Sequence, residues 1–187
     1  RFVSFAVAGN FGKIIVMLGW PIPFLVSGSD TGTAIALLPL QLLWLNLMTD
    51  GLLGLSMGVE PAEKQVMQRP PHSPSDSIWA NGLGRRTAWI GAVVGAVSLG
   101  LGFGYYAADL EQWQTIMFTT LAFMQIGQAF ATRSSTESLR TIGWRTNPLM
   151  LAIAGAVFIL QLAAVYTPLR GFLDLQLLSA LDLAICA

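Results

Sequence analysis

Polar side chains at the spacing of one helix face interrupt the apolar sequence at residues 46–50. Asn46, Thr49 and Asp50 lie at positions i, i+3 and i+4, so a helix presents their amide, hydroxyl and carboxylate groups side by side. Hard cations such as Ca²⁺ bind about six to eight oxygens of these kinds. One helix cannot complete such a shell, so other segments must contribute ligands. The pattern predicts part of a cation site, with hydrogen bonding between packed helices as the alternative.

Two other apolar stretches contain polar pairs at helical spacing. Asn10 and Lys13 are three residues apart, and so are Gln125 and Gln128. We expect Lys13 to pair with Asp50, because opposite charges at close range favour the ionised forms of both groups. This is either a plain ion pair or an arrangement in which Lys13 takes the place of a second cation. For the two glutamines, hydrogen-bonded packing and a role in the site are equally open.

The composition indicates that these residues lie inside a lipid bilayer. Of the 187 residues, 54% are hydrophobic and 11% are charged, and the mean hydropathy is +0.63. A soluble domain carries about 25% charged residues, so this chain has too little charge to cover a surface in water. The ten basic and ten acidic residues cancel, which leaves no electrostatic basis for binding nucleic acid. One cysteine and one histidine provide neither an internal disulfide nor a zinc site.

The apolar stretches predict an all-α fold, a polytopic transmembrane bundle of about six helices. A helix of about 20 residues crosses a hydrocarbon core of roughly 30 Å. The predicted spans are residues 2–20, 36–57, 87–106, 113–131, 148–166 and 172–187. The last is short, so we expect a cut helix or one completed by further sequence, and we interpret residues 1–187 as one domain of a longer polypeptide. Glycines in the third span predict close helix packing, and tryptophans near span ends predict anchoring at the membrane interface.

Basic residues gather on one side of the predicted membrane. Seven of the ten lie in the second and fourth connections: Lys64, Arg69, Arg85, Arg86, Arg133, Arg140 and Arg145. The positive-inside rule predicts that this side, and the first residue, are cytoplasmic. Short connections without glycosylation sequons favour a multipass protein of a bacterial plasma membrane.

One long segment resembles a known family. Residues 42–71 read LLWLNLMTDGLLGLSMGVEPAEKQVMQRPP, with the pattern W-x-N-x-x-T-D-G followed by G-x-E-P and M-x-R-P-P. They are similar to the sixth transmembrane helix and following cytoplasmic loop of P-type cation-transporting ATPases of the calcium-pump (P2) type. AGNFGKIIVML and TIMFTTLAFMQIGQAF resemble the fifth and eighth helices of that family. The resemblance therefore covers nearly the whole chain, as helices five to ten of the carboxy-terminal transmembrane domain.

The resemblance implies a mechanism for the parent pump. ATP, bound with Mg²⁺ by cytoplasmic domains absent from these residues, phosphorylates an aspartate, and the resulting motion switches cation sites among helices four, five, six and eight. The residues at cation-ligand positions are Asn10, Asn46, Thr49, Asp50 and Gln125. The residues of the loop expected to contact the phosphorylation domain include Glu60, Pro61, Arg69 and Pro70. The expected partners are the bilayer and the remaining domains of the parent ATPase.

Two positions depart from the pattern of calcium pumps with two sites. Lys13 and Gln125 stand where those pumps have glutamates. Exchanging two carboxylates for an ammonium and an amide should remove the site between helices five, six and eight. We therefore expect one transported cation per cycle, Ca²⁺ or another such as a proton, with Lys13 as the charge partner of Asp50.

Other functions stay open at this stage. The chain contains no D-K-T-G phosphorylation motif and no fourth-helix P-E-G-L motif, so these residues alone are expected not to hydrolyse ATP. An alternative is a stand-alone multipass secondary transporter or proton-coupled carrier, with Asp50 and Lys13 as a proton relay. A purely structural or regulatory bundle is a third possibility, and it predicts that Asp50→Asn leaves transport unchanged.

Overall fold

The structure is a computed structural model that describes residues 2–27, 35–61, 83–133, 143 and 146–187. These residues are helical and contain no strand, which confirms the predicted all-α fold. The elements are α1 (Phe2–Gly19), α2 (Ile22–Ser27), α3 (Pro39–Trp44), the π-helix η2 (Leu45–Gly51), α4 (Leu52–Met57), α5 (Leu83–Ala107), α6 (Trp113–Ala131), α8 (Pro148–Tyr166), α9 (Leu169–Leu173) and α10 (Ala180–Cys186). α3, η2 and α4 follow one another without a break.

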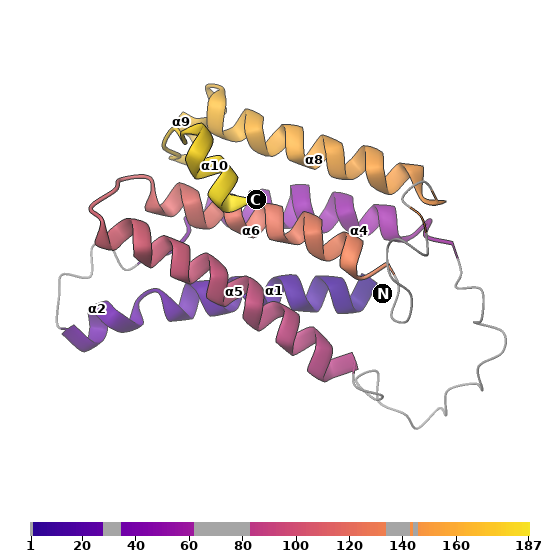
Figure 1. Cartoon of the computed structure of the whole chain (residues 1–187), viewed down its shortest axis with the longest axis horizontal. Coiled ribbons are helices and arrows are strands. Elements are labelled where there is room, and N and C mark those ends of the chain that lie inside the picture. The colour runs from indigo at the N-terminus through magenta and orange to yellow at the C-terminus, as the bar shows by residue number, and fades with distance from the viewer. Residues whose placement is uncertain (1, 28–34, 62–82, 134–142, 144–145) are drawn as a thin grey trace.

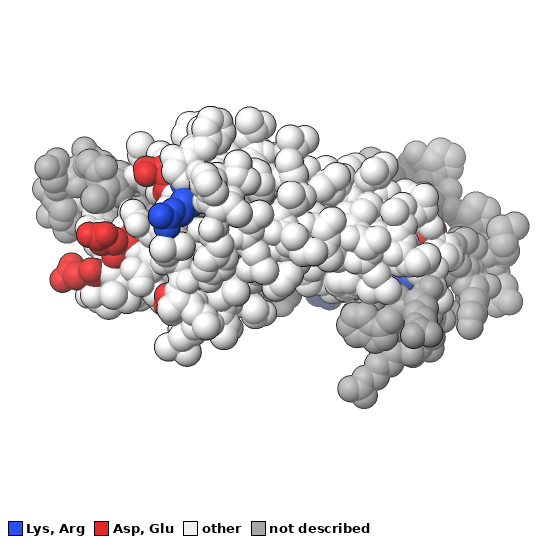
Figure 2. Space-filling view, turned by 90° about the horizontal axis from the view of Figure 1, so that it is seen from above, with Lys and Arg blue, Asp and Glu red and all other residues white. Residues whose placement is uncertain are grey.

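The long helices run alternately in opposite directions and form one elongated bundle (Figure 1). The start of α1, the end of α4, the start of α5, the end of α6 and the start of α8 all lie at one end, which we call the N-terminal end. Three described helical stretches, Phe2–Val26, Leu83–Ala107 and Pro148–Tyr166, are long and apolar enough to cross a membrane. Figure 2 shows a mostly uncharged surface along the bundle, with acidic side chains gathered at the opposite end. Such a surface suits a helical membrane protein.

Glycines allow α1 and α5 to approach closely. A Cβ at Gly91 would lie 2.7 Å from the Ala8 carbonyl oxygen, and one at Gly95 would lie 2.7 Å from the Ile15 side chain. Both distances are too short for any residue larger than glycine, so the close packing predicted from the glycines is present at these two positions. Gly100 on the same helix has nothing within 4 Å. Only part of the glycine series therefore serves helix packing.

The prediction of one helix over residues 172–187 is wrong. α9 ends at Leu173, and Asp174 adopts a left-handed conformation with φ 53°. The chain is then non-helical until Ser179 begins α10 with a capping box. Ser179 Oγ accepts a hydrogen bond from the Asp182 backbone N–H, and the Asp182 carboxylate accepts one from the Ser179 N–H. Local capping therefore overrides the continuous apolar pattern.

Side chains from other helices satisfy the non-helical backbone between α9 and α10. Gln41 Nε2 donates to the Leu173 carbonyl at 3.0 Å, and Tyr166 Oη donates to the Leu178 carbonyl at 2.8 Å. The Gln176 N–H donates to Thr115 Oγ1 at 2.8 Å. Irregular backbone at membrane depth is tolerated where protein groups bond it in this way. Apolar composition alone does not reveal such partners.

Trp20 belongs to the core and is not an interface anchor. Its side chain is fully buried, and its ring stacks on Phe103 and Trp113 with centroids 4.5 and 4.4 Å apart. Stacking on both faces fixes the end of α1 against the hairpin formed by α5 and α6. The anchoring prediction is therefore wrong for Trp20, whereas Trp89 is largely exposed.

Candidate cation site

The segment with the predicted ligands is a π-helix. η2 runs from Leu45 to Gly51, between the α-helical turns of α3 and α4. π-helical turns are rare and frequently occur at functional sites. Here the polar residues do not share one surface, because Thr49 is fully buried whereas Asn46 is exposed. Asn46 bonds α1, Thr49 bonds α6, and Asp50 bonds both helices.

Lys13 and Asp50 form an ion pair between α1 and η2. Lys13 Nζ donates to Asp50 Oδ2 and to Asn46 Oδ1, each at 2.6 Å. The Lys13 and Asp50 side chains are only 5% and 14% exposed. A buried charge is tolerated when it is paired and hydrogen-bonded. The two opposite charges that the sequence brings to membrane depth therefore neutralise each other.

Gln125 of α6 holds the second oxygen of the same carboxylate. Its Nε2 donates to Asp50 Oδ1 at 2.8 Å, and its Oε1 accepts from the Thr49 hydroxyl. The Thr49 hydroxyl also contacts the Leu45 carbonyl. Gln125 and Thr49 are both fully buried. Asp50 is thus fixed from two sides, by the ammonium of α1 and by the amide of α6.

Gly9 makes room for this arrangement. A Cβ at position 9 would lie 2.8 Å from Gln125 Nε2 and 3.5 Å from Asp50 Oδ1. The first distance is closer than a side chain permits, so α1 reaches the Asp50–Gln125 hydrogen bond only because residue 9 is glycine. The role of Gly9 is not apparent from the sequence, since a glycine within an apolar span indicates close packing but not what it packs against.

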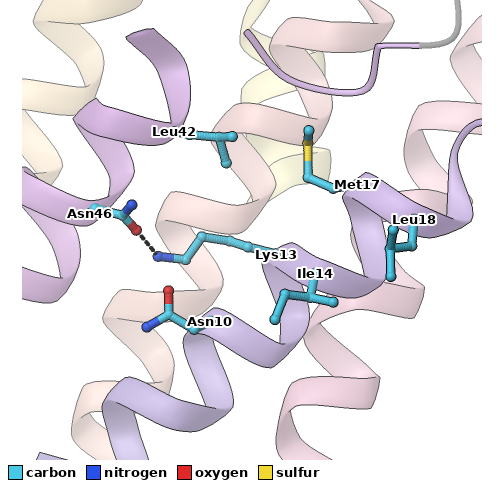
Figure 3. Close-up of a pocket in the computed structure, with 7 residues that line it drawn as sticks. All are labelled: Asn10, Lys13, Ile14, Met17, Leu18, Leu42 and Asn46. Carbon is cyan, nitrogen blue, oxygen red and sulfur yellow. Dashed lines mark hydrogen bonds between the residues drawn. The ribbon is translucent and has the colours of Figure 1, made fainter. Parts of the chain in front are cut away.

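A pocket opens beside Lys13 on the outer surface of the bundle. It has a volume of about 280 Å³ and lies between α1 and residues 42–46. Figure 3 shows its polar part, where Asn10 and Asn46 lie on either side of the end of the Lys13 side chain. Asn10 is exposed, and its Nδ2 donates to the Ala6 carbonyl of its own helix at 2.9 Å. Asn10 therefore lines the pocket without joining the Lys13–Asp50 cluster.

The other predicted residues lie away from this cluster. Gln128 Nε2 donates to the Phe5 carbonyl at 2.9 Å, one turn from Gln125 on α6. Glu60 and Pro61 follow α4 at the N-terminal end of the bundle, and the Glu60 carboxylate is buried there. Arg69 and Pro70 lie outside the described residues, as do Lys64, Arg140 and Arg145.

The cluster can bind a hard cation only with help from further groups. Its oxygens come from Asn46, Thr49, Asp50 and Gln125, and Lys13 already contacts two of them. Among the described residues, no three His, Cys, Asp or Glu side chains come together. One carboxylate with neutral oxygens falls short of the shell that Ca²⁺ prefers. A cation here would have to displace the ammonium or recruit ligands from outside the chain.

Comparison with known proteins finds similarity to cation-transporting ATPases. The family model described as "Cation transporting ATPase, C-terminus" matches residues 34–187. The chain is 29% identical over 178 residues to a "Calcium-transporting ATPase" of Bacillus subtilis (strain 168), covering 91% of this chain and 18% of that protein. It is 34% identical over 149 residues to "Calcium-transporting ATPase 1" of Yarrowia lipolytica, covering 78% and 16%. It is also 32% identical over 148 residues to mouse "Calcium-transporting ATPase type 2C member 2", covering 77% and 16%. The chain thus spans less than a fifth of the length of these relatives.

Proposed function

The chain belongs to the P-type cation-transporting ATPases, as their carboxy-terminal membrane region, and from this premise we propose that it supplies part of the intramembrane site of an ATP-driven Ca²⁺ pump. The observation that carries the proposal is the position of Asp50. Its carboxylate lies inside the bundle, between α1, η2 and α6, with neutral oxygens of Asn46 and Thr49 beside it. An ionisable group at this depth is expected to serve ion transport.

We further propose that the pump moves one Ca²⁺ per cycle. Lys13 Nζ lies 2.6 Å from Asn46 Oδ1 and from Asp50 Oδ2, the position that a cation bound by the same two oxygens would take. A Ca²⁺ ion beside this ammonium would face a like charge in a medium of low dielectric constant. Gln125 offers only a neutral amide where a second site needs a carboxylate. The remaining site would combine Asn46, Thr49 and Asp50 with ligands of a helix outside this chain, and the single Ca²⁺ would enter it only when Lys13 releases the two oxygens that it holds.

We propose a cytoplasmic position for the N-terminal end of the bundle, and a bacterial plasma membrane as its location. Arg85 and Arg86 at the start of α5, and Arg133 after α6, lie at that end, which supports this orientation. ATP and Mg²⁺ would act through cytoplasmic domains beyond this chain. The loop after α4, with Pro61, Arg69 and Pro70, would carry motion between those domains and the bundle.

The test is ATP-driven Ca²⁺ uptake into vesicles that contain the full-length protein with this chain. We expect one Ca²⁺ per ATP hydrolysed, and loss of uptake in Asp50→Asn. The matched control is Asp109→Asn, which removes an exposed carboxylate at the opposite end of the bundle and should leave uptake unchanged. A ratio of two refutes the single site, and transport of protons alone refutes Ca²⁺ as the cargo. Uptake that requires a proton gradient and resists vanadate would identify a secondary transporter instead.

A further inference from the structure

A second buried ion pair lies at the N-terminal end of the bundle, away from the cation site. Arg133 Nε and Nη2 both lie 2.9 Å from Glu60 Oε1. The side chains of Arg133 and Glu60 are 1% and 5% exposed. Asn147 Nδ2 donates to Glu60 Oε2 at 2.7 Å. Both carboxylate oxygens are therefore bonded, from two different segments of the chain.

The same groups also bond the backbone around them. Asn147 Nδ2 donates to the Ser56 carbonyl of α4 at 3.1 Å, and Asn147 Oδ1 accepts from the Met150 N–H at 2.9 Å, which caps α8. Arg133 donates to Thr146 Oγ1 at 2.6 Å and to the Gly143 carbonyl at 3.3 Å. The cluster joins the end of α4, the second residue after α6 and the start of α8.

Stability alone does not require charges at this position. A buried ion pair is often no more stabilising than apolar residues of the same volume, because the desolvation of both charges opposes their attraction. What a fully bonded pair does provide is a fixed relative position of the segments that carry it. Glu60 is turned into the bundle, whereas Pro61, the last described residue of this segment, is exposed. The pair thus holds the residue before Pro61 to the bundle.

The two ion-paired clusters link the same two segments. Within the segment that contains η2 and α4, Asp50 bonds Gln125 of α6. Beyond the end of α4, Glu60 bonds Arg133, which follows α6. A displacement of residue 60 relative to α6 must therefore strain one of these two links. Interior packing is stiff enough to transmit such strain along a helix.

We infer that Glu60, Arg133 and Asn147 are positioning residues that hold residue 60, just beyond α4, to α6 and α8, so that a displacement of residue 60 reaches the Asp50–Gln125 hydrogen bond. The inference rests on the proposed function, since it assigns these residues to coupling within that pump. It predicts that, when the Glu60–Arg133 ion pair is broken, the cytoplasmic domains still carry out phosphorylation but respond more weakly to cation binding in the membrane.

The test compares the full-length protein with Glu60→Gln and Arg133→Gln in vesicles. Phosphorylation by inorganic phosphate without Ca²⁺ reports the cytoplasmic chemistry and should be unchanged. The Ca²⁺ concentration that half-saturates phosphorylation by ATP should rise by about 5- to 150-fold, the usual range of coupling between two sites. Arg86→Gln, which removes an exposed charge at the same end of the bundle, is the matched control and should alter neither quantity.

A rescue variant distinguishes positioning from general support of the fold. Glu60→Gln turns an amide N–H₂ toward the Asn147 N–H₂, so two donors face each other. Adding Asn147→Asp restores a donor and an acceptor and returns a carboxylate close to Arg133, but it loses the hydrogen bond from residue 147 to the Ser56 carbonyl. The double variant should recover part of the Ca²⁺ dependence.

Three outcomes overturn the inference: an unchanged Ca²⁺ dependence in both single variants, equal loss of both phosphorylation reactions, or no recovery in the double variant. The proposed function fails separately, when the unaltered protein takes up no Ca²⁺.

Discussion

Replacing Lys13 by methionine removes the ammonium but keeps a long side chain, so it isolates the charge that neutralises Asp50. Both side chains are largely buried, and water cannot replace the lost partner. Removing one partner of a buried ion pair destabilises a protein by about 3–5 kcal/mol. Asp50 retains the hydrogen bond from Gln125, so we expect the lower end of that range, about 3 kcal/mol. For a domain of this size, the midpoint of thermal unfolding falls by about 6–12 °C.

The assay follows the thermal unfolding transition of this membrane region within the full-length protein in detergent, as a double-mutant cycle. Lys13→Met with Asp50→Asn removes both charges, so the double variant should lose less stability than the sum of the two single variants. Added Ca²⁺ should stabilise Lys13→Met more than the unaltered protein, because Asp50 then lacks a positive partner. Ile14→Met changes an exposed residue that lines the same pocket and is the matched control. A Lys13→Met protein as stable as this control, or single losses that simply add, refutes the reasoning.

Four further substitutions test the packing by the same measurement. Gly9→Ala should displace Gln125 from its carboxylate partner, with a net loss of about 1–2 kcal/mol after the gain in helix propensity. Gly127 lies on the same helix as Gln125, and a Cβ there would meet nothing within 4 Å, so Gly127→Ala should stabilise the protein slightly. If Gly9→Ala and Gly127→Ala change stability equally, the close approach at Gly9 is contradicted. Gly91→Ala meets a backbone carbonyl that cannot rotate away, so its loss should exceed that of Gly9→Ala. Trp20→Ala empties a ring stack and should destabilise by about 3–5 kcal/mol, and an effect near zero contradicts its role in the core.

Apolar length and helix-capping residues account for what the sequence predicts well. α6 and α8 begin and end where the apolar runs do, and Asn147 with Pro148 marks the start of α8 by a side-chain cap and a proline in the first turn. The break before α10 was also readable, because Ser179 and Asp182 have the spacing of a capping box. There the local signal and the apolar run disagree, and the local signal prevails.

The π-helix could not be predicted in the same way. Its hydrogen bonds join residues five apart instead of four, and this shift does not require a different apolar pattern. Its consequence is large, since Thr49 then bonds α6, Asn46 bonds α1, and Asp50 bonds both helices. The sequence therefore predicted several residues of the cluster together with Asn10, which lies outside it, but not how their bonds divide between two neighbouring helices.

The two ion pairs differ in how far the sequence reveals them. Lys13 and Asp50 are opposite charges within apolar stretches, so pairing is the simplest way to keep both ionised. Glu60 and Arg133 follow the ends of their spans, where water could solvate each of them. Only the packing of the start of α8 against α4 buries that second pair. Burial at a helix end is a property of the assembled bundle, and no spacing in the chain expresses it.

In the proposed cation site, groups of the chain itself already bond the carboxylate. Lys13 neutralises Asp50, and Gln125 bonds the remaining carboxylate oxygen. A cavity lined by an unpaired carboxylate would be unstable at membrane depth. This cluster, in contrast, is neutral and hydrogen-bonded without a bound cation. A cation that uses the same oxygens must compete with the ammonium, so its affinity is a difference between two interactions. The pocket of about 280 Å³ beside Lys13 adjoins the ammonium but is lined mainly by apolar side chains, so displacing a charged Lys13 into it would oppose cation binding.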